Sequence, residues 1–233
     1  AMSILPEEIP VAFTTFMALG SWKLMKQGVI IKRSSIVETL GSTTVICTDK
    51  TGTITENSMK LKVLFDFKSN QVFDDKSFNK SELSELIQFA MWSSEPVPFD
   101  PMEKTLHKVY EETQTPDLRK DFQMVHEYPL DGKPPMMTHI FENNSGERII
   151  AAKGAPEAIL AVSQLTENEK VILRQQIQEF GQQGYRVFGV AKCDFTGNSF
   201  PEKQQDFKFN FLGFTVFYDP PKQNIQQVFN KIY

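Results

Sequence analysis

A short apolar run that ends in a polar, glycine-containing loop restricts this chain more than any other feature. Val45, Ile46 and Cys47 have the character of a short buried strand in a parallel sheet. The loop Asp-Lys-Thr-Gly-Thr-Ile-Thr follows almost at once, over residues 49–55. In open α/β sheets, ligands bind at the carboxyl ends of the strands. The sequence therefore predicts an α/β fold with a ligand site at this loop.

The side chains of the loop are those that phosphoryl transfer requires. Asp49 lies at the predicted strand end, where its carboxylate can act as a nucleophile and form an aspartyl phosphate. Gly52 lets the backbone approach a phosphate closely, and Thr51 and Thr53 offer hydroxyl and amide donors. The alternative is a polar loop without chemistry. The complete seven-residue pattern after a buried strand argues against that alternative.

The rest of the chain reads as an alternation of strands and helices. Alternating apolar residues predict a strand and turn over 60–75, and we expect further strands at 122–128, 137–141, 148–152, 186–191 and 209–217. Helical spacing of apolar residues predicts helices over 80–92, 102–112, 155–163 and 166–183. Ser81 is a possible N-cap of the first of these helices.

The N-terminal stretch 1–20 is apolar except for two carboxylates, Glu7 and Glu8, and it contains two prolines. A complete membrane helix needs ~20 mostly apolar residues, and a signal peptide needs a basic start that is not present here. Two interpretations stay open: an amphipathic or buried helix, or the second half of a membrane helix that begins upstream. Basic residues over 23–33 follow, which is typical of the cytoplasmic side of a membrane segment.

Composition excludes several functional classes. The net charge of −4 without a basic block argues against nucleic acid as a partner. The two cysteines are too few for a disulfide framework. The three histidines, His107, His126 and His139, have no metal-ligand spacing, so we expect them to be surface or core residues.

The loop at Asp49 is the phosphorylation signature of P-type ATPases, and the chain resembles that family almost throughout. The resemblance is to calcium-pump-like (bacterial type II) members, from the end of their fourth membrane helix through their nucleotide-binding domain. Five more stretches agree, in the family's order: Pro6-Glu7-Glu8-Ile9-Pro10, Asp100-Pro101-Met102-Glu103-Lys104, Lys153-Gly154-Ala155-Pro156-Glu157, Gly184-Tyr185-Arg186, and Asp219-Pro220-Pro221-Lys222.

The resemblance implies a role for each matching residue. Asp49, Lys50 and Thr51 would be catalytic, with Asp49 and Thr51 also holding Mg²⁺. Glu7 would bind the transported cation; carbonyl oxygens freed by the two prolines, together with a carboxylate, suit Ca²⁺. The implied nucleotide-binding residues are Glu103, Leu130, Lys153, Gly154 and Arg186, and the implied hinge residues are Asp219 and Pro220.

One position departs from the family pattern. The family commonly stacks the adenine on an aromatic side chain, and the matching position here is Leu130. Tyr128 is a possible substitute, or the apolar face of Leu130 suffices.

The resemblance also implies a domain organisation. A partial transmembrane helix (1–20) and a stalk (21–42) would precede the first part of a Rossmann-like, haloacid-dehalogenase-like phosphorylation domain (43–59). An α+β nucleotide-binding domain on an antiparallel sheet (60–213) would be inserted there, followed by the hinge and return (214–233). ATP and Mg²⁺ would be the cofactors.

Three functions are compatible with these residues. The first is a fragment of an ATP-driven cation pump that is inactive alone and needs the membrane and its missing domains. The full-length pump would be a multi-pass membrane protein, with residues after about 20 in the cytoplasm. The second is a soluble phosphatase of the same superfamily, but such enzymes usually have a second Asp two residues after the nucleophile, where this chain has Thr51. The third is a stand-alone ATP-binding module.

Overall fold

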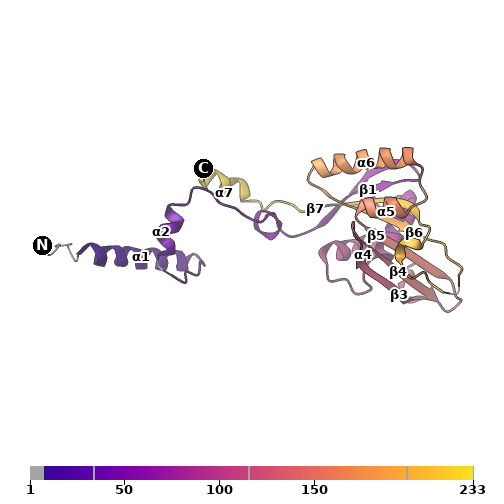
Figure 1. Cartoon of the computed structure of the whole chain (residues 1–233), viewed down its shortest axis with the longest axis horizontal. Coiled ribbons are helices and arrows are strands. Elements are labelled where there is room, and N and C mark those ends of the chain that lie inside the picture. The colour runs from indigo at the N-terminus through magenta and orange to yellow at the C-terminus, as the bar shows by residue number, and fades with distance from the viewer. Residues whose placement is uncertain (1–7, 34, 115, 198, 233) are drawn as a thin grey trace. The chain divides into compact units, whose positions relative to one another are not determined.

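A seven-stranded sheet, in which every pairing is antiparallel, organises the larger part of the chain (Figure 1). The computed structural model describes residues 8–33, 35–114, 116–197 and 199–232, and these divide into two units, 1–49 and 50–233. The sheet belongs to the second unit, with the strand order β2-β1-β7-β6-β5-β4-β3. The strands are β1 (Lys60–Asp66), β2 (Gln71–Asp74), β3 (Phe122–Asp131), β4 (Met136–Asn143), β5 (Arg148–Gly154), β6 (Arg186–Lys192) and β7 (Asn210–Tyr218).

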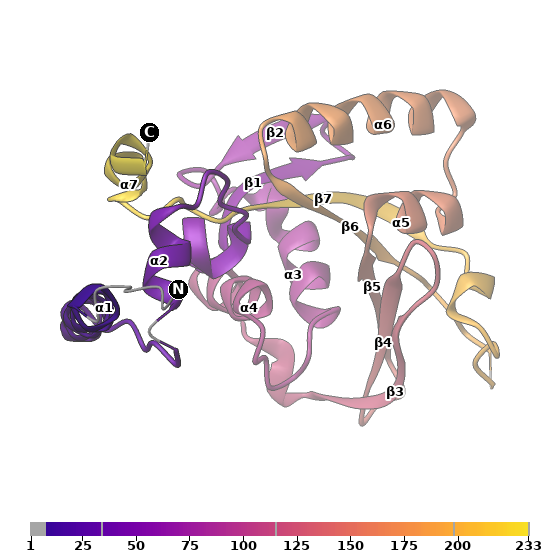
Figure 2. The ribbon, with the colours of Figure 1, turned by 60° about the vertical axis from the view of Figure 1, so that its left-hand side comes forward.

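Helices cover both faces of the sheet (Figure 2). Helices α3 (Ser84–Trp92) and α4 (Pro101–Thr113) pack on one face, and α5 (Pro156–Val162) and α6 (Glu167–Gln182) pack on the other. A last helix, α7 (Ile225–Ile232), follows the sheet in sequence. The predicted α+β domain built on an antiparallel sheet is therefore confirmed.

The two-residue period of the strands creates two cores. In β7, Phe217 packs toward α3 and α4, whereas Phe214 and Val216 pack toward α5 and α6, and all three are at most 1% exposed. Burying each of these side chains contributes about 1.5–3 kcal/mol to folding.

Strand β7 lies beside β1, so the first and last strands of the domain are neighbours, and the segments that lead into and out of the sheet lie next to each other. β7 also continues to Tyr218, beyond residue 213, where the sequence placed the end of this domain.

One predicted helix cap is wrong. A 3-10 turn, η2 (Ser81–Leu83), precedes α3, and the Ser81 hydroxyl donates to the Glu82 carboxylate at 3.2 Å instead of capping the helix. A serine close to the start of an apolar periodicity satisfies the sequence rule for a cap. However, the 3-10 turn moves the N-cap position of α3 from Ser81 to Leu83.

The first unit contains two helices, α1 (Glu8–Lys26) and α2 (Ile36–Gly41). They meet at Gly20, where an added Cβ would lie 2.9 Å from Cγ1 of Val37. Within the described ranges, no helix has the combination of length and apolarity needed to cross a bilayer. The predicted partial membrane helix begins among residues 1–7, which lie outside the described residues, and it stays a prediction.

The strand predicted at Val45–Cys47 is not formed. Residues 43–49 have no regular secondary structure, and Val45 and Ile46 are 73% and 61% exposed. A strand of a parallel sheet needs neighbours for its hydrogen bonds and cover on both faces, and none of the described strands pairs with this segment. The Rossmann-like phosphorylation domain is thus not formed by the described residues.

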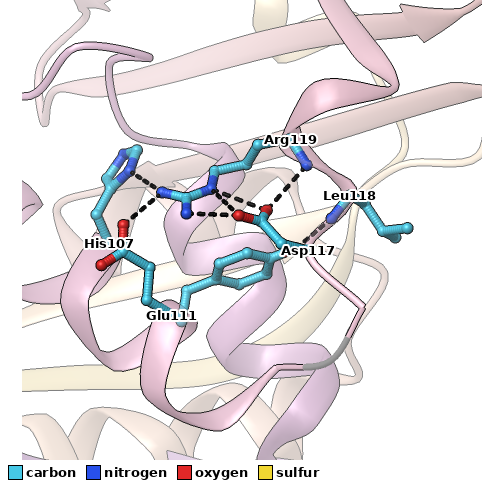
Figure 3. A network of polar contacts seen from close by, with 6 residues as sticks. His107, Glu111, Asp117, Leu118 and Arg119 are labelled. Carbon is cyan, nitrogen blue, oxygen red and sulfur yellow. Dashed lines mark hydrogen bonds and ion pairs between the residues drawn. The ribbon is translucent and has the colours of Figure 1, made fainter.

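A network of polar contacts around Arg119 links the segment after α4 to side chains of that helix (Figure 3). The Arg119 guanidinium donates to Asp117 at 2.7 Å and to Glu111 at 3.0 Å, and it lies 3.4 Å from Nδ1 of His107. The Tyr110 hydroxyl accepts a hydrogen bond from the Leu118 amide. The hydrogen bond from Arg119 lowers the pKa of Asp117 from 3.8 to about 2.

Asp117→Asn should therefore remove a contribution to stability that depends on pH. Because the folded-state pKa is lowered, the contribution is fully present above pH ~4 and is lost as the pH falls toward 2. The Asp117 side chain is 39% exposed, so we expect no more than ~1 kcal/mol. Urea unfolding at pH 6, 4 and 2.5 measures this difference, with Asp206→Asn as the surface control. A difference between Asp117→Asn and wild type that is the same at all three pH values would contradict the assignment.

Candidate functional site

A cavity of about 190 Å³ opens on the sheet face that α3 and α4 cover. Its walls are mostly apolar, and they come from α4, from the end of β3 and from the four central strands. The lining residues are Asp100, Met102, Glu103, Leu106, Leu130, Met137, Lys153, Gly154, Phe188, Thr215 and Phe217. A small, mainly apolar cavity with a few convergent polar groups is typical of a ligand site.

The polar part of the wall is an ion pair. The Lys153 ammonium lies 2.6 Å from Oε1 of Glu103, and it also donates to the Ser94 hydroxyl at 2.9 Å. The two paired side chains are only 12% and 10% exposed. Burial lowers the pKa of the Lys153 amine, and the neighbouring Glu103 carboxylate opposes that shift. The pair is thus a polar group preorganised in an otherwise apolar wall.

Local sequence signals place both partners of this pair. The Asp100 carboxylate caps α4 by accepting from the amide of Met102 at 2.8 Å, and Pro101 occupies the first turn. Glu103 is therefore held in the first turn of α4. Lys153 lies at the end of β5, next to Gly154, where an added Cβ would lie 2.5 Å from the Met136 Cα. Only glycine permits this close approach of β5 to β4.

A second polar arrangement joins the loop after Asp49 to the end of β7. The Asp219 carboxylate accepts from the Thr55 hydroxyl at 2.5 Å and from the Ser58 amide at 3.1 Å. The Glu56 amide donates to the carbonyl of Pro220 at 2.9 Å, and the Lys222 amide donates to Ile54 at the same distance.

Thr55 and Lys222 of this arrangement also make hydrogen bonds to the wide turn η1 (Lys50–Ile54). Gly52 has φ +78°, its amide donates to the Thr55 hydroxyl at 3.2 Å, and its carbonyl accepts from the Lys222 ammonium at 2.9 Å. The two chain segments that connect the sheet to its flanking residues are therefore bonded to each other side by side.

The family described as P-type ATPase, cytoplasmic domain N, matches residues 97–224, more than half of the chain. The match contains the cavity-lining segments from α4 to β7 and the Asp219 segment.

This chain belongs to the P-type ATPases.

Curated relatives of this family align with nearly the whole chain. Calcium-transporting ATPase 1 of Saccharomyces cerevisiae is 31% identical over an alignment that covers 97% of this chain and 28% of the yeast protein. The probable cation-transporting P-type ATPase of Mycoplasma genitalium is 32% identical, covering 97% and 26%. Magnesium-transporting ATPase, P-type 1, of Salmonella typhimurium is 26% identical, covering 96% and 25%. The chain thus spans about a quarter of the length of these P-type ATPases.

The fold brings together four of the five nucleotide-binding residues predicted for this P-type ATPase chain. Glu103, Leu130, Lys153 and Gly154 all line the cavity. The fifth, Arg186, does not line it; this residue is exposed at the start of β6 and pairs with Phe217 of β7.

The suggestion that Tyr128 replaces the missing aromatic at Leu130 is wrong. Tyr128 is buried in the core under α5 and α6, and its hydroxyl donates to the carbonyl of Pro201. A register irregularity between Tyr128 and Asp131 separates it from Leu130, which is 62% exposed and lines the cavity.

The aromatic side chains at the cavity are Phe188 and Phe217, and neither belongs to a sequence motif that indicated a nucleotide site. Their rings make an edge-to-face contact with centroids 5.9 Å apart. Phe188 follows the predicted Gly184-Tyr185-Arg186 segment by two residues. That spacing was the one available signal, because alternate residues of a strand share a face.

The predicted catalytic residues lie in the loop before and within η1. Asp49 and Thr51 are exposed, and Lys50 accepts a hydrogen bond from the Thr55 amide at 3.0 Å through its carbonyl. Glu7 lies outside the described residues.

Proposed function

We propose that the cavity binds the base of ATP and that this chain is the nucleotide-binding part of a cation pump. The observation that carries the proposal is the Lys153–Glu103 pair set in the apolar wall of a P-type ATPase domain N. A volume of about 190 Å³ is below the ~300 Å³ typical of whole-ligand pockets. The cavity therefore suits a planar base, with the ribose and phosphates outside.

Two features of the cavity suit adenine. Phe188 and Phe217 form an aromatic wall, and stacking of a base on an aromatic ring is worth ~1–3 kcal/mol. Glu103 supplies a carboxylate oxygen that can accept a hydrogen bond from the exocyclic amine of adenine. The Lys153 ammonium offers its one remaining N–H donor, since two of its three are already used by Glu103 and Ser94.

Arg186 has a different proposed role, as a contact to the phosphates. It lies on β6 two residues before Phe188, and alternate residues of a strand share a face. Because Arg186 is exposed, its side chain is free to meet a charged group that leaves the mouth of the cavity. A guanidinium matches phosphate oxygens in bidentate geometry.

In the complete pump, Asp49 would receive the terminal phosphoryl group of ATP, with Lys50 and Thr51 beside it. Asp219 and Pro220 would form the hinge between the nucleotide-binding and phosphorylation domains, supported by the paired segments around Thr55. The pump would be a multi-pass membrane protein with residues after about 20 in the cytoplasm, and Glu7 would bind the cation. We propose Ca²⁺ as that cation from the Pro6–Pro10 pattern, although relatives are named for both calcium and magnesium transport.

Mg²⁺ is the metal that this chemistry implies, and the oxygen donors of Asp49 and Thr51 fit its preference. The described residues around Asp49 do not complete a site: within these ranges, the one group of three or more metal-binding side chains is elsewhere. Bound Mg²⁺ would neutralise charge on the transferred phosphoryl group. Asp49 itself would supply the attacking carboxylate oxygen.

ATP titration of this chain tests the nucleotide proposal. We expect amide chemical-shift changes at Lys153, Gly154 and Phe188, and tighter binding in Leu130→Phe, because a third ring would be added to the wall of the cavity. The gain should be up to ~10-fold, which corresponds to the lower part of the stacking range. Val125→Phe is the matched control, since Val125 is exposed on the same strand but does not line the cavity. The proposal fails if ATP causes no shifts near Lys153.

A further inference from the structure

A second cluster of functional side chains lies on the α3 and α4 face of the sheet, and it includes none of the residues that line the cavity. His139 of β4 and Glu127 of β3 are direct cross-strand partners. Glu95 lies in the segment between α3 and α4. One ring nitrogen of His139 and one carboxylate oxygen from each glutamate lie within 4.8 Å of one another. The three residues are far apart in sequence, which is why histidine spacing did not indicate a metal site.

The His139 ring shows which of its nitrogens is available. The side chain is 0% exposed, and its Nδ1 lies 3.1 Å from the carbonyl oxygen of Ser94. A carbonyl oxygen only accepts, so Nδ1 carries the proton and Nε2 of the neutral ring has a free lone pair. Nε2 is buried and has no hydrogen-bond partner among the described residues. Leaving a buried nitrogen unpartnered is unfavourable, and a ligand that accepts its lone pair would offset that cost.

The hydrogen bond from Nδ1 to the carbonyl of Ser94 also fixes the orientation of the His139 ring. Metal-binding histidines usually donate their other ring N–H to a carbonyl or carboxylate, which sets the tautomer and the orientation of the ring. His139 already makes this contact. Burial lowers the pKa of His139, and the neighbouring Glu95 and Glu127 carboxylates oppose that shift.

The charges and dimensions of the cluster also suit a divalent ion. Two carboxylates face one neutral imidazole, while the Lys153 ammonium is paired with Glu103 at 2.6 Å. Ligand atoms about 2.0–2.2 Å from a tetrahedral ion lie ~3.4 Å apart. Glu127 is exposed and Glu95 is partly exposed, so rotation of their side chains can close the present spacing of up to 4.8 Å.

We propose that Glu95, Glu127 and His139 form a binding site for a divalent transition-metal ion such as Zn²⁺, with Nε2 of His139 as the nitrogen ligand. An imidazole and two carboxylates form a mixed nitrogen and oxygen set that first-row transition metals prefer, whereas Mg²⁺ and Ca²⁺ prefer oxygen alone. Three protein ligands leave the fourth position open to water. The site is independent of ATP and of the proposed pump function.

Zinc titration of the 233-residue chain tests this site. The chain is stripped with a chelator, carries Cys47→Ser to remove the exposed thiol, and is titrated with ZnCl₂ by calorimetry without nucleotide. We expect one Zn²⁺ per chain. Glu127→Gln and Glu95→Gln should each weaken binding by about 10-fold or more, whereas Glu157→Gln, on exposed α5 surface, should leave it unchanged. Mg²⁺ added at the same excess over the chain as Zn²⁺ should not compete with Zn²⁺ for the site.

Long-range ¹H–¹⁵N spectra of the histidine rings add a direct readout. Zn²⁺ should shift the Nε2 resonance of His139 while Nδ1 keeps its proton. The proposal is overturned if Zn²⁺ does not bind, if Glu127→Gln binds as tightly as Glu157→Gln, or if Nε2 of His139 does not shift. Any of these outcomes leaves the ATP titration, and hence the nucleotide proposal, unaffected.

Discussion

Replacing Asp49 by Asn in the complete pump will abolish the acid-stable phosphoenzyme that forms from ATP. An amide has no anionic oxygen to attack phosphorus, and only a carboxylate can form the acyl phosphate. The segment around Asp49 is exposed, so the substitution removes no buried contact. We therefore expect complete loss of phosphorylation without loss of folded protein. Acid quenching after incubation with γ-labelled ATP measures the effect directly.

Nucleotide binding provides the internal control for Asp49→Asn. All residues that line the cavity belong to the second unit, 50–233, so ATP affinity should stay within about two-fold of wild type. Asp206→Asn, on an exposed turn, should keep full phosphorylation. Label retained by Asp49→Asn would show that another residue is the nucleophile. Robust ATP turnover by the 233-residue chain alone, lost in Asp49→Ala, would instead favour the soluble phosphatase.

Lys153→Met should destabilise the nucleotide-binding domain by ~3–5 kcal/mol and weaken ATP binding. The substitution leaves the Glu103 carboxylate, 10% exposed, without its cation. An uncompensated buried charge costs far more than the net contribution of the intact pair. The loss of ATP affinity follows because Lys153 is the one lysine among the described residues that line the cavity.

A double variant separates the two causes. Glu103→Gln combined with Lys153→Met removes both charges and should recover most of the stability, but not the ATP affinity. Urea unfolding followed by Trp92 fluorescence, in a Trp22→Phe background, reports on the second unit because Trp92 is buried in its core. Lys170→Met breaks a surface pair with Glu167, whose side chain is 78% exposed, and should change the stability much less than Lys153→Met. If Lys153→Met costs no more than Lys170→Met, the Lys153–Glu103 pair is not a buried ion pair in solution.

Local sequence signals were sufficient for much of the fold. Apolar spacing predicted a helix over 102–112, and α4 begins one residue earlier because Asp100 caps it and Pro101 fits its first turn. Strand β5 and the turn before it were visible from the Asn143–Gly146 segment and the apolar run after it. The strand at Val45–Cys47 failed for the opposite reason: a short apolar run is a strand only when another strand pairs with it.

The sequence by itself determined the family, through continuous motifs whose chemistry is local: the Asp49 loop, the Lys153 segment and the Asp219 segment. The tertiary structure alone decided which side chains meet. Phe188 and Phe217 share a wall because β6 and β7 pair in one register, and a shift of either strand by one residue would turn its ring to the other face. The same holds for His139 and Glu127, which pairing between β3 and β4 makes neighbours. Contacts of this kind depend on register between distant strands, and no spacing along the chain encodes that register.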